Sequence, residues 1–102
     1  MSVDIKVFKM INGEEIISKV TSGSESGFWL EDPATIMLQP TQGGGMGVGI
    51  APYMPYAEGK IYLNRTAIAA EGVPEEKMKN EYNRIFGAGI EIAPASMLAA
   101  LR

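Results

Sequence analysis

The first forty residues alternate apolar and polar positions in a way that predicts three consecutive β-strands. Residues 3–10 (VDIKVFKM) begin with apolar side chains at every second position, the pattern of a strand that buries one face. Phe8 and Met10 then place apolar groups on the other face, so we expect this strand to be covered on both sides at its end. An Asn-Gly pair at 12–13 precedes a second apolar run, residues 14–20. This arrangement predicts a hairpin closed by a tight turn with positive φ at both central residues.

The second run also places apolar side chains on both faces. Ile16 and Val20 point one way with Ser18 between them, and Ile17 points the other way. Residues 21–27 (TSGSESG) are small and polar, which predicts a loop before the third strand.

The third run predicts a long strand whose alternate residues share one mainly apolar face. Alternate residues make up this face, namely Phe28, Leu30, Asp32, Ala34, Ile36 and Leu38. Pro33 has no N–H group to donate to a β-ladder, so we expect a bulge or a bend at that position.

Residues 39–49 (QPTQGGGMGVG) predict a flexible loop, because glycines are concentrated there. A glycine loop that cradles phosphate lies between a strand and a helix, but residues 50–52 (IAP) do not begin a helix. A loop between strands is therefore the favoured interpretation. Two further strands are expected at 48–56 and 61–70, joined across Glu58-Gly59, and the prolines in the first make it irregular or an edge strand.

After residue 70 the apolar positions change to a helical period. The apolar stripe consists of Met78, Tyr82, Ile85 and Phe86, spaced i, i+4, i+7 and i+8. Pro74 suits the first turn of a helix and Gly87 suits its end. Five short strands, the first three in one meander, describe a small and strongly bent barrel, and we expect this helix to cover the open end of that barrel. A short apolar run at 90–92 and a brief terminal helix at 94–102 are expected to follow.

Composition limits the chemistry that this chain can perform. Its 102 residues are enough for one domain, and they include no cysteine and no histidine. The absence of cysteine excludes thiolate chemistry. The absence of histidine removes the commonest general base and the commonest transition-metal ligand, and we expect no cofactor. Nine Lys and Arg against twelve Asp and Glu give a net charge of -3, which argues against broad binding of polyanions. With no apolar run long enough to span a bilayer, we expect a cytoplasmic protein without membrane contact.

Residues 10–20 (MINGEEIISKV), followed by FWLED at 28–32, resemble the first Sm motif of the Sm/LSm family. In that motif a glycine after the first strand is followed by apolar residues at plus three and plus seven. The matching residues are Gly13, Ile16 and Val20. Residues 61–68 would then be the second Sm motif.

Over nearly its whole length the chain is similar to small Sm-like proteins of tailed phages that infect cyanobacteria. The segments that carry this likeness read GEEII, LEDP, PYMPYA and YNRIFGAGIEIAP. The resemblance implies a mainly β fold, a small and strongly bent five-stranded Sm-like (SH3-like) barrel over residues 1–70. Residues 71–102 would add a C-terminal α-helix and tail. A phage-encoded protein would act in the cytoplasm of the host cell.

The chain departs from the Sm pattern at several functional positions. The usual second glycine falls at Ser18, and the loop Asp and Asn that help to hold a base fall near Gly23 or Ser24 and at Gly27. The Arg-Gly pair of the second motif falls at Asn64-Arg65, so the arginine is one position late. The Sm pattern also has a helix before the first strand, and this sequence predicts none there.

The resemblance implies a homo-oligomeric ring of about five to seven copies that binds single-stranded RNA at its loops. The candidate RNA-binding residues are Ser24, Ser26, Phe28, Asn64 and Arg65. For Phe28, core packing is the favoured role, because it begins an alternating apolar face. An exposed cation at a strand end is the alternative for Arg65. Trp29 suits either base stacking or a subunit interface.

Two other classes of function compete with RNA binding. A ring that only contacts other proteins would suit the acidic charge and the aromatic residues Tyr53, Tyr56 and Tyr62. An enzyme would need paired carboxylates, and the best pair is Glu31 and Asp32. Adjacent strand residues point to opposite faces, so these two are not expected to act on one substrate, and we do not expect an enzyme.

Overall fold

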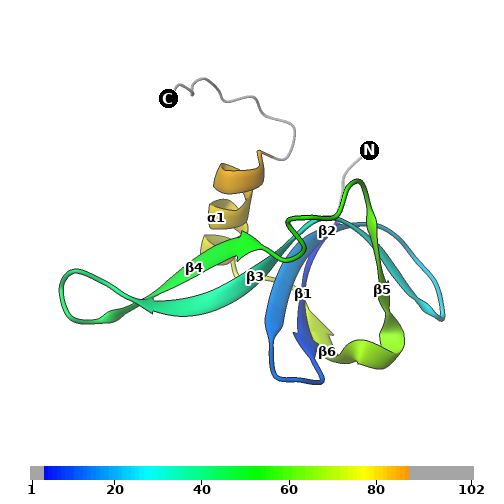
Figure 1. The fold of residues 1–102 in the computed structure, drawn as a ribbon, viewed down its shortest axis with the longest axis horizontal. Helices are drawn as coiled ribbons and strands as arrows, with labels where there is room; N and C mark the ends of the chain where they lie inside the picture. Colours follow the sequence, from blue (N-terminus) through cyan, green and yellow to red (C-terminus); the bar gives the residue numbers. More distant parts are fainter. Residues whose placement is uncertain (1–3, 88–102) are drawn as a thin grey trace.

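A computed structural model describes residues 4–87 of the chain. The fold is mainly β, with one antiparallel sheet of six strands and, within those residues, a single α-helix after the last strand (Figure 1). The elements are β1 (Asp4–Met10), β2 (Glu15–Gly23), β3 (Gly27–Pro40), β4 (Met46–Pro52), β5 (Ile61–Asn64), a 3-10 turn η1 (Arg65–Ala67), β6 (Ile68–Gly72) and α1 (Glu76–Phe86).

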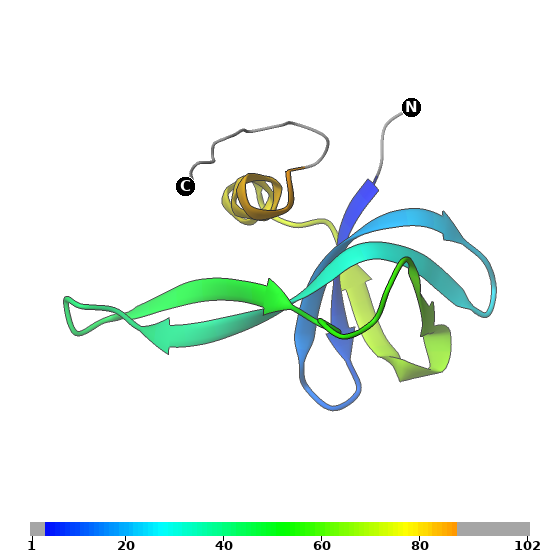
Figure 2. The same cartoon turned by 45° about the horizontal axis from the view of Figure 1, so that its top comes forward.

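The sheet has the order β4-β3-β2-β1-β6, and β5 pairs with β3 beside this path. The long β3 is shared between two partners, because residues 27–30 pair with β5 whereas residues 34–40 pair with β4. Figures 1 and 2 show the consequence. The strands around β1 curl into a strongly bent body, and the β3–β4 hairpin extends away from it as an arm. We call residues 34–52 of this hairpin the arm.

The turn between β1 and β2 is longer than the predicted two-residue turn. The Met10 N–H donates to the Glu14 carbonyl at 2.7 Å, and the Gly13 N–H donates to the Met10 carbonyl at 2.9 Å. The loop therefore has three residues, and only Gly13, with φ of 93°, lies in the left-handed region. Asn12 keeps a negative φ, and its side chain accepts the Glu14 N–H at 3.0 Å. This local bond, followed by a glycine, is typical of a type I turn with a bulge.

The predicted bulge near Pro33 is confirmed, and it changes which side chains share a face. Ile17 pairs with Ala34, but Lys19 pairs with Glu31, so β3 carries one extra residue between these pairs. Asp32 adopts a φ of 55° at this position. The extra residue reverses the alternation of side chains along β3. The prediction that alternate residues from 28 to 38 share one face is therefore wrong.

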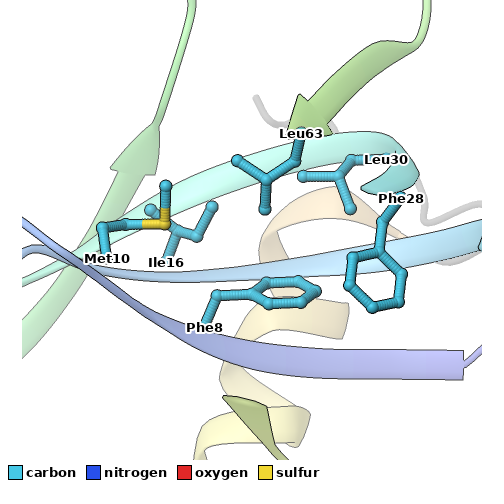
Figure 3. Packing of buried hydrophobic residues seen from close by; sticks show 6 residues of the cluster. All are labelled: Phe8, Met10, Ile16, Phe28, Leu30 and Leu63. Atoms are coloured by element: carbon cyan, nitrogen blue, oxygen red, sulfur yellow. The ribbon is translucent and has the colours of Figure 1, made fainter. Parts of the chain in front are cut away.

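Each face of the sheet has its own apolar cluster. The first cluster lies inside the bent body and consists of Phe8, Met10, Ile16, Phe28, Leu30 and Leu63 (Figure 3). The second cluster lies on the opposite face, where Ile17, Ala34 and Tyr82 are fully buried. Ile5 and Val7 pack against this second cluster, so β1 is covered on both sides as expected.

Several strand boundaries differ from the expected ones, and β4 ends at Pro52 where a strand to residue 56 was expected. β2 reaches Gly23, so only Ser24–Ser26 remain as a loop. Most of the glycine-rich stretch is paired in the arm, since Gln39 faces Gly47 and Met37 faces Gly49. The expected fifth strand is divided by η1 into β5 and β6, which gives six strands in place of five.

The predicted helix is confirmed from Glu76 to Phe86, and it ends at Gly87 with φ of 72°. Tyr82 is fully buried, and Met78 and Phe86 are partly buried against the second cluster. Ile85, at the margin of the stripe, remains 44% exposed. The helix packs on the chain's own sheet, but it covers the face opposite the first cluster.

The expectations for residues 90–92 and 94–102 lie outside the described part of the chain. Within residues 4–87, no helix is long and apolar enough to cross a membrane.

Candidate functional site

Two chain segments that are far apart in sequence meet beside the β2–β3 turn. The turn is closed by the Ser24 N–H, which donates to the Gly27 carbonyl at 2.9 Å. The end of β5 lies against it, because Gly27 pairs with Asn64 and the Arg65 N–H donates to the Ser26 carbonyl at 2.8 Å. The structure therefore brings together all five residues proposed from the sequence, and we call this group, with Tyr62, the candidate site.

The Arg65 side chain fastens the turn to the end of β5. Its Nη2 donates to the Ser24 carbonyl at 2.8 Å and its Nε donates to the Glu25 carbonyl at 3.1 Å. Nη1 lies 3.5 Å from a carboxylate oxygen of Glu71. Three of the five guanidinium N–H donors are thus engaged within the described residues, which leaves two for a ligand. With 44% of its side chain exposed, Arg65 can still reach a phosphate or a base edge.

Phe28 has a packing role in this site. It is only 7% exposed and belongs to the first cluster, where its ring centroid is 5.2 Å from that of Phe8. The guanidinium carbon of Arg65 lies 4.6 Å from the same ring, a cation–π contact. The Phe28 ring therefore packs against the guanidinium group of Arg65, and it is not available for stacking with a base.

Hydroxyl groups form a second set of contacts at the turn. The Ser24 and Ser26 Oγ atoms are 3.1 Å apart, and the Ser26 Oγ is hydrogen-bonded to the Tyr62 hydroxyl. These serine hydroxyls, with the charge of Arg65 nearby, lower the pKa of Tyr62. The Tyr62 ring lies over Gly27, where a Cβ atom would collide with the Leu63 carbonyl and approach the ring to 2.9 Å. Glycine is therefore required there by close packing.

Tyr62 also forms the edge of an exposed aromatic surface. It is the cross-strand neighbour of Trp29, and their ring centroids are 5.0 Å apart. Trp29 is 44% exposed. Sequence reasoning had assigned Tyr62 only to protein contacts and missed its place at the turn. The one available signal was its position two residues before Asn64, which puts both on one face of a strand.

Of the two acidic residues considered for catalysis, Asp32 has a structural role. Asp32 lies at the bulge, and its carboxylate is 3.0 Å from the ammonium group of Lys19, which is largely buried. Within residues 4–87, no cluster of histidine, cysteine or carboxylate side chains could hold a metal ion.

Comparison with known proteins gives no family. No protein-family model matches the chain, and no curated protein matches it with significant similarity.

Proposed function

We propose that this protein is an Sm-like small barrel that assembles into a homo-oligomeric ring and binds single-stranded RNA at the candidate site. One observation carries the proposal. The Ser24–Ser26 turn and the Asn64–Arg65 segment are about forty residues apart in sequence, and they lie in direct contact. These are the two places at which the resemblance to the Sm motifs puts RNA-binding loops. The proposed phage origin rests on that resemblance alone.

The exposed groups of the candidate site suit a single strand better than a duplex. Single-stranded RNA is recognised through polar contacts to base edges and through stacking on aromatic rings. Asn64 and Ser24 are exposed and can make polar contacts, Arg65 has two N–H donors left, and Trp29 and Tyr62 offer an aromatic surface. The net charge of -3 implies modest affinity, because few cations are available to neutralise phosphates.

The unpaired edges of the sheet are the observation that supports a ring. Within residues 4–87, no strand pairs with the outer edge of β4 or of β6, which lie at opposite ends of the strand order. Head-to-tail pairing of unlike edges forms a closed ring when the rotation from one copy to the next adds up to a full turn. Such pairing covers the β4 and β6 edges, whereas β5, which pairs only with β3 within the described residues, keeps an open edge. Pro52 is the last residue of β4, and Pro55 lies beyond it, so Met46–Ala51 retain their N–H donors. A ring of about five to seven copies is the expected size.

The experiment that tests this proposal is a titration of the native oligomer with short labelled U-rich and A-rich RNAs. We expect binding of RNA in preference to DNA of the same sequence, with affinity that falls as salt rises from about 50 to about 200 mM. An oligomer that binds neither RNA at the lower salt concentration would contradict the RNA part of the proposal. Native mass spectrometry of the same sample tests the ring independently, since a monomer at micromolar concentration excludes it.

A second candidate function is a ring that acts as a protein-interaction scaffold. The observation that favours it is the amount of apolar surface outside the two clusters. Leu38 is 69% exposed, Met46 is 64% exposed and Val73 is 85% exposed. Such surface in a soluble chain marks a contact with another protein. An oligomer of ring size that binds no RNA would leave this candidate standing.

A further inference from the structure

An open groove lies between the first turn of α1 and the arm, on the face of the sheet that carries the second cluster. Its volume is about 730 Å³. Within residues 4–87, two of its apolar lining residues remain largely uncovered, since Val73 is 85% exposed and Leu38 is 69% exposed. The apolar lining includes Val7, Ile36, Leu38, Val48, Val73 and Met78.

The charged side chains that line this groove are all acidic. They are Glu14, Glu15 and Glu75, and among the described residues no lysine or arginine lines it. Glu15 is paired with Lys9 at 3.2 Å, but Glu14 and Glu75 form no ion pair within residues 4–87. An occupant that complements the groove should therefore combine apolar side chains with a cation.

Residues 97–102 (MLAALR) of the same chain have this composition. They belong to the segment for which the sequence predicts a brief helix. On a helix, Met97, Leu98 and Leu101 would share one face, because they are spaced i, i+1 and i+4. Arg102, which follows them directly, is the one cation among residues 88–102.

The length of chain between α1 and this segment is sufficient to reach the groove. The 11 residues of α1 rise about 16 Å, and the groove lies beside the start of the helix. Residues 87–96 can span up to about 33 Å when extended. The other apolar run, residues 90–92, begins after only about 10 Å of chain, and its Glu91 would be repelled by the acidic lining. Residues 97–102 therefore fit by both reach and charge.

We propose that residues 97–102 dock in this groove of their own chain. Their apolar side chains would cover Leu38 and Val73. The Arg102 guanidinium would lie near the two carboxylates that form no ion pair within the described residues. This inference depends neither on the ring nor on RNA binding. It has a consequence for the scaffold candidate, because a partner protein that uses Leu38 and Val73 must first displace the segment.

Disulfide cross-linking tests the docking, because the chain has no native cysteine. Met97→Cys and Leu101→Cys are each combined with Leu38→Cys in one chain and oxidised. A disulfide needs Cα atoms within about 7 Å, so at least one of these double variants should form a disulfide within the chain. Gln39→Cys is the matched control in place of Leu38→Cys. Its side chain covers Gly49 on the opposite face of the arm, so it should not cross-link.

Electrophoresis without reductant and intact mass distinguish the outcomes of this experiment. A cross-linked single chain with Leu38→Cys, and none with Gln39→Cys, supports the docking. Equal cross-linking at both positions shows that the segment meets the arm at random. A covalent dimer shows that the segment reaches another copy, and the absence of any disulfide shows that it docks elsewhere. Each of these last three results overturns the inference.

Thiol labelling measures directly whether the segment covers the groove. Leu38→Cys should react with a maleimide at least about tenfold faster in a chain that ends at Ser96 than in the full chain. Gln39→Cys should react at the same rate in both, and circular dichroism checks that both chains stay folded. Fast labelling of Leu38→Cys in both chains means an open groove, and slow labelling in both means a different occupant. Either result overturns the inference.

A charge reversal tests the position of Arg102 with the same measurement. In the full chain, Arg102→Glu should raise the labelling rate of Leu38→Cys, because the new carboxylate is repelled by the acidic lining. Adding Glu14→Lys and Glu75→Lys should restore the slow rate, since the attraction is re-formed with the signs exchanged. A rate that Arg102→Glu leaves unchanged, or that the two lysines fail to restore, would overturn the docking of Arg102 in this groove.

Discussion

The hydroxyl of Tyr82 donates a hydrogen bond of 2.6 Å to the backbone carbonyl of Asp32. The Glu31 carbonyl lies 3.1 Å from the same oxygen, and the Lys19 N–H donates to it at 3.2 Å. These backbone groups flank the bulge in β3, where the regular ladder is interrupted. A residue of α1 thus satisfies the polar groups that the bulge leaves unpaired, and it connects the helix to the bend of the sheet.

Removing this hydroxyl should destabilise the fold. Tyr82→Phe keeps the ring in the second cluster but leaves buried backbone groups without their partner, so we expect a loss of about 1–3 kcal/mol in the free energy of unfolding. Urea denaturation measures it. Tyr56→Phe is the matched control, because Tyr56 is fully exposed and should change stability by less than about 0.5 kcal/mol. Equal stability of the two variants would mean that the hydroxyl has no structural role.

The same residue should make stability depend on alkaline pH. Burial, with the nearby charge of Asp32, raises the pKa of Tyr82 well above its ordinary value of 10.0. Below about pH 10 this phenol is neutral in both states and has no effect on the pH dependence. Above that value the unfolded chain ionises first, so stability should fall by up to about 1.4 kcal/mol per pH unit.

The contribution of Tyr82 to this loss is measured by difference. Urea unfolding of the parent protein and of Tyr82→Phe is measured at several values between about pH 8 and about pH 11. The difference between the two free energies of unfolding removes the pH dependence that both proteins owe to their other tyrosines and lysines. The gap between the two stabilities should narrow as pH rises. A gap that stays constant would show that Tyr82 ionises normally.

Arg65 should contribute both to stability and to RNA binding. Arg65→Ala removes the bonds to the Ser24 and Glu25 carbonyls, and for this partly exposed side chain we expect a loss of about 1–2 kcal/mol. If RNA binds at the candidate site through one phosphate at Arg65, the slope of log affinity against log salt should become shallower by about 0.7. RNA titrations at several salt concentrations measure this slope.

Arg65→Lys serves as the control for charge. Lysine keeps the cation but cannot bond two carbonyls in a fork, so it should restore much of the salt dependence and little of the stability. An unchanged salt dependence in Arg65→Ala, in a protein that still binds RNA, would place the RNA elsewhere.

The packing of α1 predicts different costs at two neighbouring positions. Phe86 contacts Tyr82 with ring centroids 4.9 Å apart, and it is partly buried against the second cluster. Phe86→Ala should therefore cost about 2–4 kcal/mol, whereas Ile85→Ala, at a position 44% exposed, should cost less than about 1 kcal/mol. Thermal and urea unfolding compare the two. A larger loss at Ile85 would imply that an additional partner covers this side of the helix.

Local patterns in the sequence predicted the first three strands and the helix. Alternation placed β1, β2 and the beginning of β3, and helical spacing with Gly87 placed α1, because these signals depend only on near neighbours. The bulge was predictable from Pro33, since proline lacks the donor that a ladder needs. The residues of the candidate site were supplied by the resemblance to the Sm motifs and not by a local pattern, and that resemblance did not point to Tyr62.

The consequences of the bulge could be decided only by the tertiary structure. Whether Ala34 and Ile36 continue the face of Phe28 depends on how many residues the bulge contains, and that number is set by pairing with β2. The division of the expected fifth strand also depends on tertiary pairing. Its first part, β5, pairs with β3, and its second part, β6, pairs with β1, so the chain forms η1 between them. The role of Arg65 required the spatial contact as well, since the carbonyls it binds are about forty residues away in sequence. Sequence periodicity carries no information about such long-range contacts, which is why the pattern predicted the elements but not the way they meet.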